Sequence, residues 1–265
     1  MAHPTSISTS VEPIAVIGIG CRLPGQASSP SKLWHLLVNN ETGYGPVPPS
    51  RYNAAAYYHP DADRPGSINS TGGYFIQEDI RAFENAFFGI NNLEATSMDP
   101  QQRKLLEVTY EALENAGVAL ETVHGSNTGV YMGNYTNDYL NMQYKDPEYF
   151  SRYSATGSGL AALANRITHC FDLRGPSHVV DTASVVAAAN LIQSPEQQMV
   201  GVKAGILSPE AMCHTFDESA NGYARAEGVS AVYLKRLSDA LRDGDPVRSV
   251  VRGTAVNGLV ILILW

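Results

Sequence analysis

The chain of 265 residues has few cysteines and no long apolar run. Its three cysteines, Cys21, Cys170 and Cys213, are an odd number and predict a reducing, cytoplasmic compartment rather than a disulfide framework. The longest apolar stretch spans residues 259–265, far short of the roughly 20 residues that a membrane-spanning helix needs. Residues 1–11 lack the basic and apolar regions of a signal peptide, and we expect a disordered lead-in there. No membrane partner is expected.

Basic residues are also scarce. Lys and Arg together number 18 against 26 for Asp and Glu, which gives a net charge of −8. Nucleic acid binding needs a basic surface, so nucleic acid is not expected as a partner. Glycine and proline, at 23 and 15 residues, are close to background usage, and 44% of the chain is hydrophobic. This composition excludes collagen and low-complexity chains and favours a globular protein.

Buried strands and helices alternate along the sequence. Residues 14–20 (IAVIGIG) form an unbroken apolar run, typical of a strand that is buried on both faces. Residues 99–116 predict a helix with Asp99 as its cap, Pro100 in its first turn and Gly117 at its left-handed end. Further helices are predicted at 31–40 and 159–171, a loop at 44–73, and strands at 129–133, 177–181, 185–192, 229–237 and 247–256. The alternation predicts the α/β class.

Two glycines after the first strand suggest a dinucleotide-binding turn. In that fingerprint, however, the third glycine would fall on Leu23, and Pro24 prevents a helix from starting there to present its amides to a pyrophosphate. We therefore interpret Gly18 and Gly20 as the end of a core strand at a tight turn. No nucleotide is expected as a cofactor.

Two adjacent His–Cys pairs, 169–170 and 213–214, suggest metal ligands. Adjacent side chains diverge on a helix or strand, and the CxxC and HxxxH spacings are absent. No metal is expected. The sequence also lacks a GxSxG elbow, a P-loop and an HExxH motif, although ionisable side chains are dense in the loop at 216–228.

Taken together, several segments resemble the β-ketoacyl synthase (ketosynthase) domain of modular and fungal iterative type I polyketide synthases. Residues 12–25 (EPIAVIGIGCRLPG) are similar to the start of that domain, and the resemblance extends to residue 258. The other matches, in family order, are MDPQQR at 98–103, NRI at 165–167, GPS at 175–177, DTA at 181–183, LSP at 207–209, FD at 216–217, GYARAEG at 222–228 and VRGTAVNG at 251–258.

The resemblance implies a thiolase-like α/β fold, usually a homodimer. It implies an acyltransferase of polyketide or fatty acid biosynthesis, which condenses a malonyl-type extender with an enzyme-bound acyl thioester by a decarboxylative Claisen reaction. The implied partner is an acyl carrier protein with its phosphopantetheine arm, and the domain itself binds no cofactor.

The resemblance breaks down after DTA, where the family has its nucleophilic cysteine at a strand-to-helix elbow. Ser184 occupies that position here, and the following residues resemble a later strand of the family. A serine without a positioned base is a poor nucleophile, so we interpret Ser184 as a deletion junction rather than a catalytic residue. The deletion, near residues 182–188, removes the cysteine, its helix and part of the next strand.

Chain length supports this interpretation. Three residues join the predicted strands at 177–181 and 185–192, whereas a parallel crossover needs about 10 to 12. The two segments therefore cannot be parallel neighbours. Either they pair differently, or the second segment is not a strand.

The C-terminal residues also depart from the family. The family continues after residue 258 into a second half that carries two active-site histidines, whereas this chain runs into the apolar, β-prone tail LVILILW at 259–265 and no histidine follows His214. We expect an incomplete ketosynthase domain over 12–258, with a truncated C-terminal half. Three interpretations remain open: a ketosynthase fragment that is inactive, a non-catalytic dimer partner, and a mis-spliced product without function.

Other residues of the matched motifs are expected to be structural. We predict that Arg103 and Arg166 pair within the fold and that Cys21 and Cys170 are buried apolar groups. Cys213 does not follow the nucleophile motif and does not replace it. Packing and loop-ordering roles are predicted for Asp217, Tyr223, Arg225 and Glu227, in a loop that resembles the rim of the family's active site.

Overall fold

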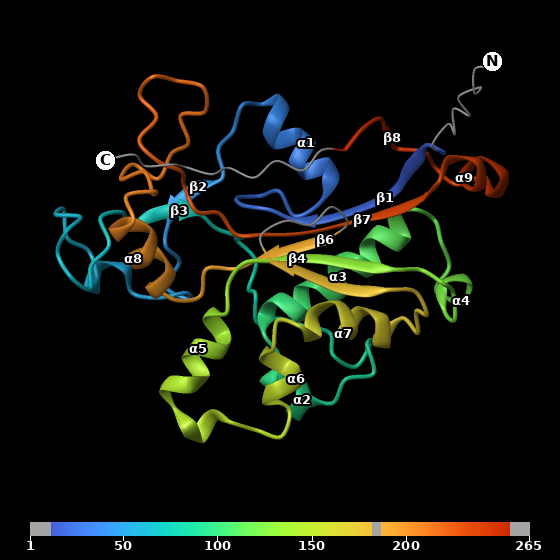
Figure 1. Ribbon diagram of the computed structural model, residues 1–265, viewed down its shortest axis with the longest axis horizontal. Coiled ribbons are helices and arrows are strands. Elements are labelled where there is room, and N and C mark those ends of the chain that lie inside the picture. The colour runs from blue at the N-terminus through green and yellow to red at the C-terminus, as the bar shows by residue number, and fades with distance from the viewer. Residues whose placement is uncertain (1–11, 182–186, 255–265) are drawn as a thin grey trace, which may run out of the picture.

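The computed structural model describes residues 12–181 and 187–254 and is built around a mixed β-sheet (Figure 1). Along the sheet the strands follow the order β5-β4-β6-β7-β1-β8. Strand β4 is parallel to β5 and β6, whereas β7 is antiparallel to β6 and β1, and β8 is antiparallel to β1. The strands are β1 (Ile14–Arg22), β4 (Val130–Asn134), β5 (Ser177–Asp181), β6 (Ala187–Asn190), β7 (Gly228–Arg236) and β8 (Ser249–Val251); a separate pair is formed by β2 (Tyr44–Pro46) and β3 (Gly72–Tyr74).

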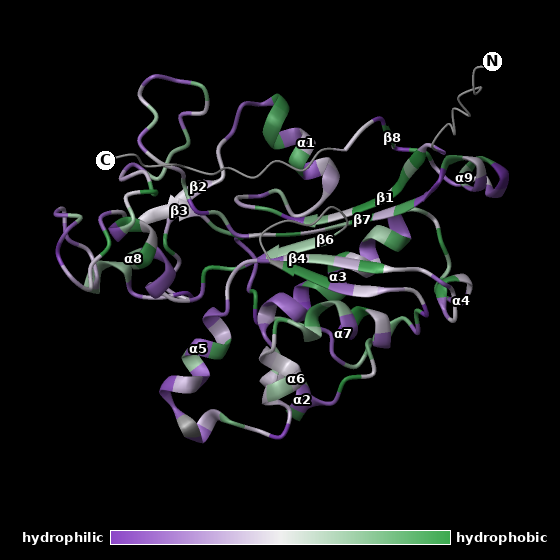
Figure 2. Cartoon of the chain, viewed as in Figure 1, coloured by the Kyte–Doolittle hydropathy of each residue, from purple (hydrophilic) through white to green (hydrophobic). Residues whose placement is uncertain are grey.

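Two helices, α3 (Pro100–Asn115) and α7 (Ala162–Cys170), pack against one face of the large sheet (Figure 1). Figure 2 shows hydrophobic residues gathered where these helices meet the strands, and the largest cluster of buried side chains lies there. The other helices are α1 (Pro30–Val38), α2 (Asn92–Ser97), α4 (Leu120–Val123), α5 (Asp138–Lys145), α6 (Ser154–Ser158), α8 (Glu196–Lys203) and α9 (Leu237–Asp243), with 3-10 turns η1 (Ala54–Ala56) and η2 (Pro147–Tyr149). None of the helices in the described ranges is long and apolar enough to cross a membrane.

Helix α3 confirms the sequence prediction at both ends. The Asp99 carboxylate accepts a hydrogen bond of 2.8 Å from the Gln101 amide, Pro100 occupies the first turn, and Gly117 has a φ of +69° just beyond the last turn. The side chains of Leu105 and Leu106 are fully buried. Helix α3 is therefore a central helix of the core.

The two glycines of the first strand lie inside β1 rather than in a turn, so our expectation of a tight turn was wrong. A Cβ atom on Gly18 would lie 2.0 Å from the carbonyl oxygen of Ala112, and one on Gly20 would lie 2.3 Å from that of Val108. Both carbonyls belong to α3. The glycines are needed because the α3 backbone approaches β1 closely, and the strand continues to Arg22.

Strands β5 and β6 pair with opposite sides of β4. The first of our two alternatives is therefore correct: the segments pair differently, and β6 is a strand. Asp181, the last residue of β5, is level with Asn134, and Ala187, the first of β6, is level with Met132. Between Asp181 and Ala187 the chain must move back by two residues along the strand direction, about 7 Å, and across two strand spacings, about 10 Å. The six Cα–Cα steps between these residues can span up to about 20 Å. Five residues, 182–186, are enough because β6 begins so near the level at which β5 ends.

Some local predictions were incomplete. The segment at 44–73, predicted as loop, contains β2, η1 and most of β3. Helix α1 buries none of its residues, and the apolar side chain of Trp34 is 68% exposed. The predicted lead-in at 1–11, the predicted deletion junction at Ser184 and the tail at 259–265 lie outside the described residues.

Candidate functional site

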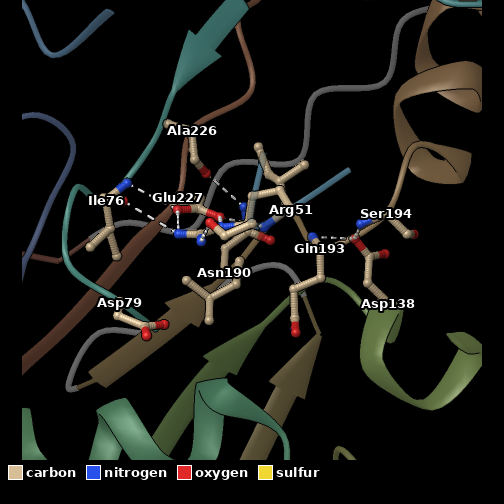
Figure 3. Close-up of polar contacts among 12 residues, drawn as sticks. Arg51, Ile76, Asp79, Asp138, Asn190, Gln193, Ser194, Ala226 and Glu227 are labelled. Atoms are coloured by element: carbon tan, nitrogen blue, oxygen red, sulfur yellow. Dashed lines mark hydrogen bonds and ion pairs between the residues drawn. The ribbon is translucent and has the colours of Figure 1, made fainter. Parts of the chain in front are cut away.

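The parallel strands β4, β5 and β6 end at the same edge of the sheet, and open α/β sheets place functional groups at such edges. Asn134 and Asn190 are the last residues of β4 and β6, and the chain re-enters the sheet nearby at the start of β7. Figure 3 shows the polar contacts that join these segments. We therefore take this edge as the candidate functional site.

A buried ion pair between Arg51 and Glu227 lies at its centre (Figure 3). The guanidinium donates two hydrogen bonds to the carboxylate, Nε to Oε1 at 2.7 Å and one terminal nitrogen to Oε2 at 2.9 Å. The carboxylate also accepts bonds from the amides of Ile76 at 2.9 Å and Ile192 at 3.1 Å. Both charged side chains are at most 1% exposed, so no water replaces these contacts. The pair fixes four segments that are far apart in sequence.

Beside the ion pair, Asp138 begins α5 and holds the chain that leaves β6. Its Oδ2 atom accepts hydrogen bonds from the amides of Gln193 at 3.0 Å and Ser194 at 3.2 Å. Burial raises the pKa of Asp138, and the positive charge of Arg225 partly offsets this. Burial likewise raises the pKa of Tyr52 to about 12, against the opposing effect of Arg225. The charge of Arg225 therefore acts on two buried acidic groups.

Arg225 itself is 7% exposed, and both of its terminal guanidinium nitrogens are buried without a hydrogen-bond partner. The Oδ1 atom of Asp138 also lacks a partner. The two side chains thus interact through their charges without a direct hydrogen bond.

A second set of polar side chains connects the ends of β4 and β6 to the start of α3. The Asn134 amide donates to Gln101 Oε1 at 2.9 Å and to the Ala189 carbonyl at 3.0 Å. Gln101 in turn donates to Asp99 Oδ2 at 3.0 Å, and Gln193 donates to Asp99 Oδ1 at 3.2 Å. Burial raises the pKa of Asp99 from its usual 3.8 to about 6, although these hydrogen bonds oppose the change.

The structure places the residues predicted for the loop at 216–228 in two groups. Glu227 and Arg225 belong to the buried network, as the predicted packing roles require. Asp217 accepts hydrogen bonds from Ser219 in the exposed part of the loop, and Tyr223 is 41% exposed. Ser184, which the resemblance places at the nucleophile position, lies outside the described residues.

The two arginines of the other motifs pair within the fold, as predicted. Arg103 donates two hydrogen bonds to the Met98 carbonyl, at 3.0 and 2.6 Å, and Arg166 contacts Glu94 at 2.6 Å. These contacts hold the segments next to α3 and α7. Neither arginine belongs to the network described above.

The cysteines occupy three different environments. Cys21 is buried, Cys170 is partly buried, and burial raises the pKa of both thiols. Cys213 is exposed and accepts a hydrogen bond of 3.2 Å from the Ala224 amide. Within the parts of the chain that the structure describes, no three His, Cys, Asp or Glu side chains lie close enough to hold a metal ion.

Sequence reasoning missed Arg51, Asp138 and Gln193. Arg51 lies in a predicted loop and meets a partner 176 positions further along the chain. No periodicity or local motif relates two residues at that separation. Asp138 carried a weak signal, since it starts a helix shortly after a predicted strand.

The chain belongs to the β-ketoacyl synthase family: the sequence model of its N-terminal domain matches residues 11–185 and 183–240. The chain is 58% identical over 268 residues to a highly reducing polyketide synthase, srdA, of Neurospora crassa, and equally to the highly reducing polyketide synthase 19 of Pyricularia oryzae. These alignments cover 93% of the chain but only 11% and 10% of the relatives. The chain thus spans about a tenth of the length of the curated relatives it matches.

Solved structures of ketosynthases share the fold. An oxazolomycin ketosynthase domain of Streptomyces albus superposes with a TM-score of 0.83 at 31% identity, over 93% of this chain and 46% of that one. A ketosynthase from module 6 of the bacillaene synthase of Bacillus subtilis superposes with a TM-score of 0.76 at 30% identity. This match covers 91% of this chain and 43% of that one. These matches confirm the predicted thiolase-like α/β fold and show that the chain corresponds to its N-terminal part.

The same comparisons bear on the deletion. The two segments of the family match meet at residues 183–185, where sequence analysis places the junction. The alignment with the Neurospora relative runs over 268 residues, whereas 93% of 265 residues is about 246, so it includes about 22 positions more than this chain contributes.

The ion pair leads to a first prediction. Glu227→Ala should lower the free energy of unfolding by roughly 3–5 kcal/mol, because it leaves the Arg51 guanidinium buried without a partner. Urea unfolding measures the change. As a control, Asp79→Ala removes the exposed ion pair between Asp79 and Arg81 and should change the midpoint little. Equal effects of the two substitutions would contradict a central role for the pair.

Asp99 leads to a second prediction, for the dependence of stability on pH. Because its pKa is raised to about 6, the folded chain keeps a proton that the unfolded chain has already lost. The free energy of unfolding should therefore fall as the pH rises from about 4 to about 6. Asp99→Asn keeps a side chain that can cap the helix but cannot ionise, so this decline should be weaker in the variant. Urea unfolding midpoints measured between pH 4 and 7 test this. An unchanged slope would show that Asp99 does not titrate there.

Proposed function

We propose that this chain is the N-terminal part of a ketosynthase of the highly reducing polyketide synthase type that has lost its acyl-transfer step. The observation that carries the proposal is the five-residue connection between β5 and β6, with Ser184 at the family's nucleophile position. In this proposal residues 12–258 form the incomplete domain.

The chemistry explains why so short a connection matters. A ketosynthase of this family transfers an acyl group from a thioester to a cysteine, and the thiolate is stabilised by the positive end of a helix that follows it. Backbone amides of the same turn stabilise the thioester oxyanion. In this proposal the segment that carries the cysteine and its helix is missing here, and a serine without a positioned base does not replace the thiolate.

The proposal also concerns the partners of the chain. The acyl group of the family reaction arrives on the phosphopantetheine arm of an acyl carrier protein, which is a substrate rather than a resident cofactor. We propose that this chain accepts no acyl group from that arm. The buried network of Arg51, Glu227 and Asp138 then acts only to position the backbone at the sheet edge.

The proposal predicts that the chain forms no acyl-enzyme at residue 184. Incubation with an acetyl or hexanoyl thioester, followed by intact mass measurement and peptide mapping, should show no adduct there. Cys213→Ser removes background acylation of the exposed thiol. Ser184→Cys alone should not restore specific acylation, whereas a chain with a cysteine and the relatives' missing segment inserted should gain it. A stable adduct on Ser184 of the unaltered chain would overturn the proposal.

A second candidate function, that of a non-catalytic dimer partner, is favoured by the position of β5. This strand lies at one end of the sheet order, and in the described residues no strand pairs with its outer side. Val180 on β5 is 42% exposed. An edge of this kind can pair with the same edge of a second copy.

This candidate predicts an ordered dimer whose formation depends on the edge. Val180→Lys should convert the dimer to a monomer that still unfolds in a cooperative thermal transition, because a lysine on an edge strand opposes pairing. As a control, Val200→Lys changes an exposed residue of α8 and should leave the dimer intact. Light scattering coupled to size exclusion measures both. A monomeric unaltered chain, or an aggregate without a thermal transition, would reject the dimer.

A further inference from the structure

A cavity of about 60 Å³, partly open to solvent, lies between the large sheet and the helices α3 and α7. It is found at the amino end of β4, beside Gly129 and Val130, whereas the Arg51–Glu227 pair lies beyond the carboxyl ends of the parallel strands. The cavity is thus separate from the candidate functional site. Its helical wall is formed by Leu113 of α3 and Ile167 of α7, with Phe171 just after α7.

Small residues and a short strand account for the cavity. Gly129, Ala187 and Ala231 contribute little side-chain volume from the sheet side. Strand β6 begins at Ala187, level with Met132, so β4 extends two residues beyond the start of its neighbour. Close packing would require larger side chains at these positions.

The lining determines what the cavity can hold. Apolar side chains dominate it, and no charged residue is among those that line it in the described ranges. Thr109 contributes a hydroxyl that is buried and has no hydrogen-bond partner. A buried water needs two to four polar partners, and polar atoms contribute little of the cavity's surface, so the cavity suits water poorly. The volume of about 60 Å³ is less than half that of an apolar cavity of roughly 150 Å³ that binds benzene or xenon, so it fits a molecule of a few heavy atoms.

We propose that this cavity is a binding site for small, uncharged, apolar molecules of the size of xenon or a two- to three-carbon alkane. A ligand that binds the folded chain and not the unfolded chain stabilises it by RT ln(1 + [L]/Kd), so the melting temperature rises with the ligand concentration. The contact surface is supplied by Leu113, Ile167 and Phe171, and the site works independently of acyl transfer.

Xenon is a suitable probe because it has no hydrogen-bonding group and does not react. We expect the melting temperature of the full chain to rise under xenon pressure, and dissolved ¹²⁹Xe to show a concentration-dependent shift of its magnetic resonance signal. Ala187→Val should fill the cavity, raise the melting temperature without xenon and abolish both responses. Ala189 lies on the same strand, is buried and does not line the cavity. Ala189→Val should therefore overpack the core and lower the melting temperature, while both responses to xenon remain.

Thr109→Val supplies a second test in case a cavity-filling chain does not fold. It keeps the shape of the side chain and removes the unpartnered hydroxyl, so the melting temperature and the xenon response should both increase. The absence of a xenon response in the unaltered chain, or an equal response after Ala187→Val, would overturn the proposal. Neither result would bear on acylation at residue 184.

Discussion

The buried contact between Arg51 and Glu227 constrains the rest of the sheet edge. Removing two charges from water is costly, and the cost is best offset when the polar atoms of both groups find partners. Glu227 meets that condition with donors from Arg51, Ile76 and Ile192, which lie on three separate segments. Any displacement of one segment would leave a buried charge poorly paired. The pair is therefore best understood as a positional constraint on the backbone rather than a large source of stability.

The geometry of the sheet explains how a core can persist beside the proposed deletion. Strands β5 and β6 occupy opposite sides of β4, and their neighbouring ends allow a short connection. Helix α3 contacts β1, β6 and β7, which are joined to one another in the sheet order, so its packing does not depend on the connection between β5 and β6. In our proposal the loss concerns the segment that carries the family's chemistry, whereas the strands and helices that support it are retained.

Local signals in the sequence predicted the local structure well. The capping signals at Asp99, Pro100 and Gly117 identified α3, and an unbroken apolar run identified β1. The interior position of Gly18 was not predicted, because it depends on the approach of a helix more than 90 residues away. The family resemblance supplied the fold and singled out Glu227. It did not supply Arg51, since long-range ion pairs leave no pattern in a single sequence.

The close approach of α3 to Gly18 and Gly20 has a mechanical consequence. Because the backbone of the helix rests almost directly on that of the strand, there is no layer of side chains that could slide or repack between them. Helix and strand must therefore move as one rigid body, and any hinge of this fold has to lie in the loops around them.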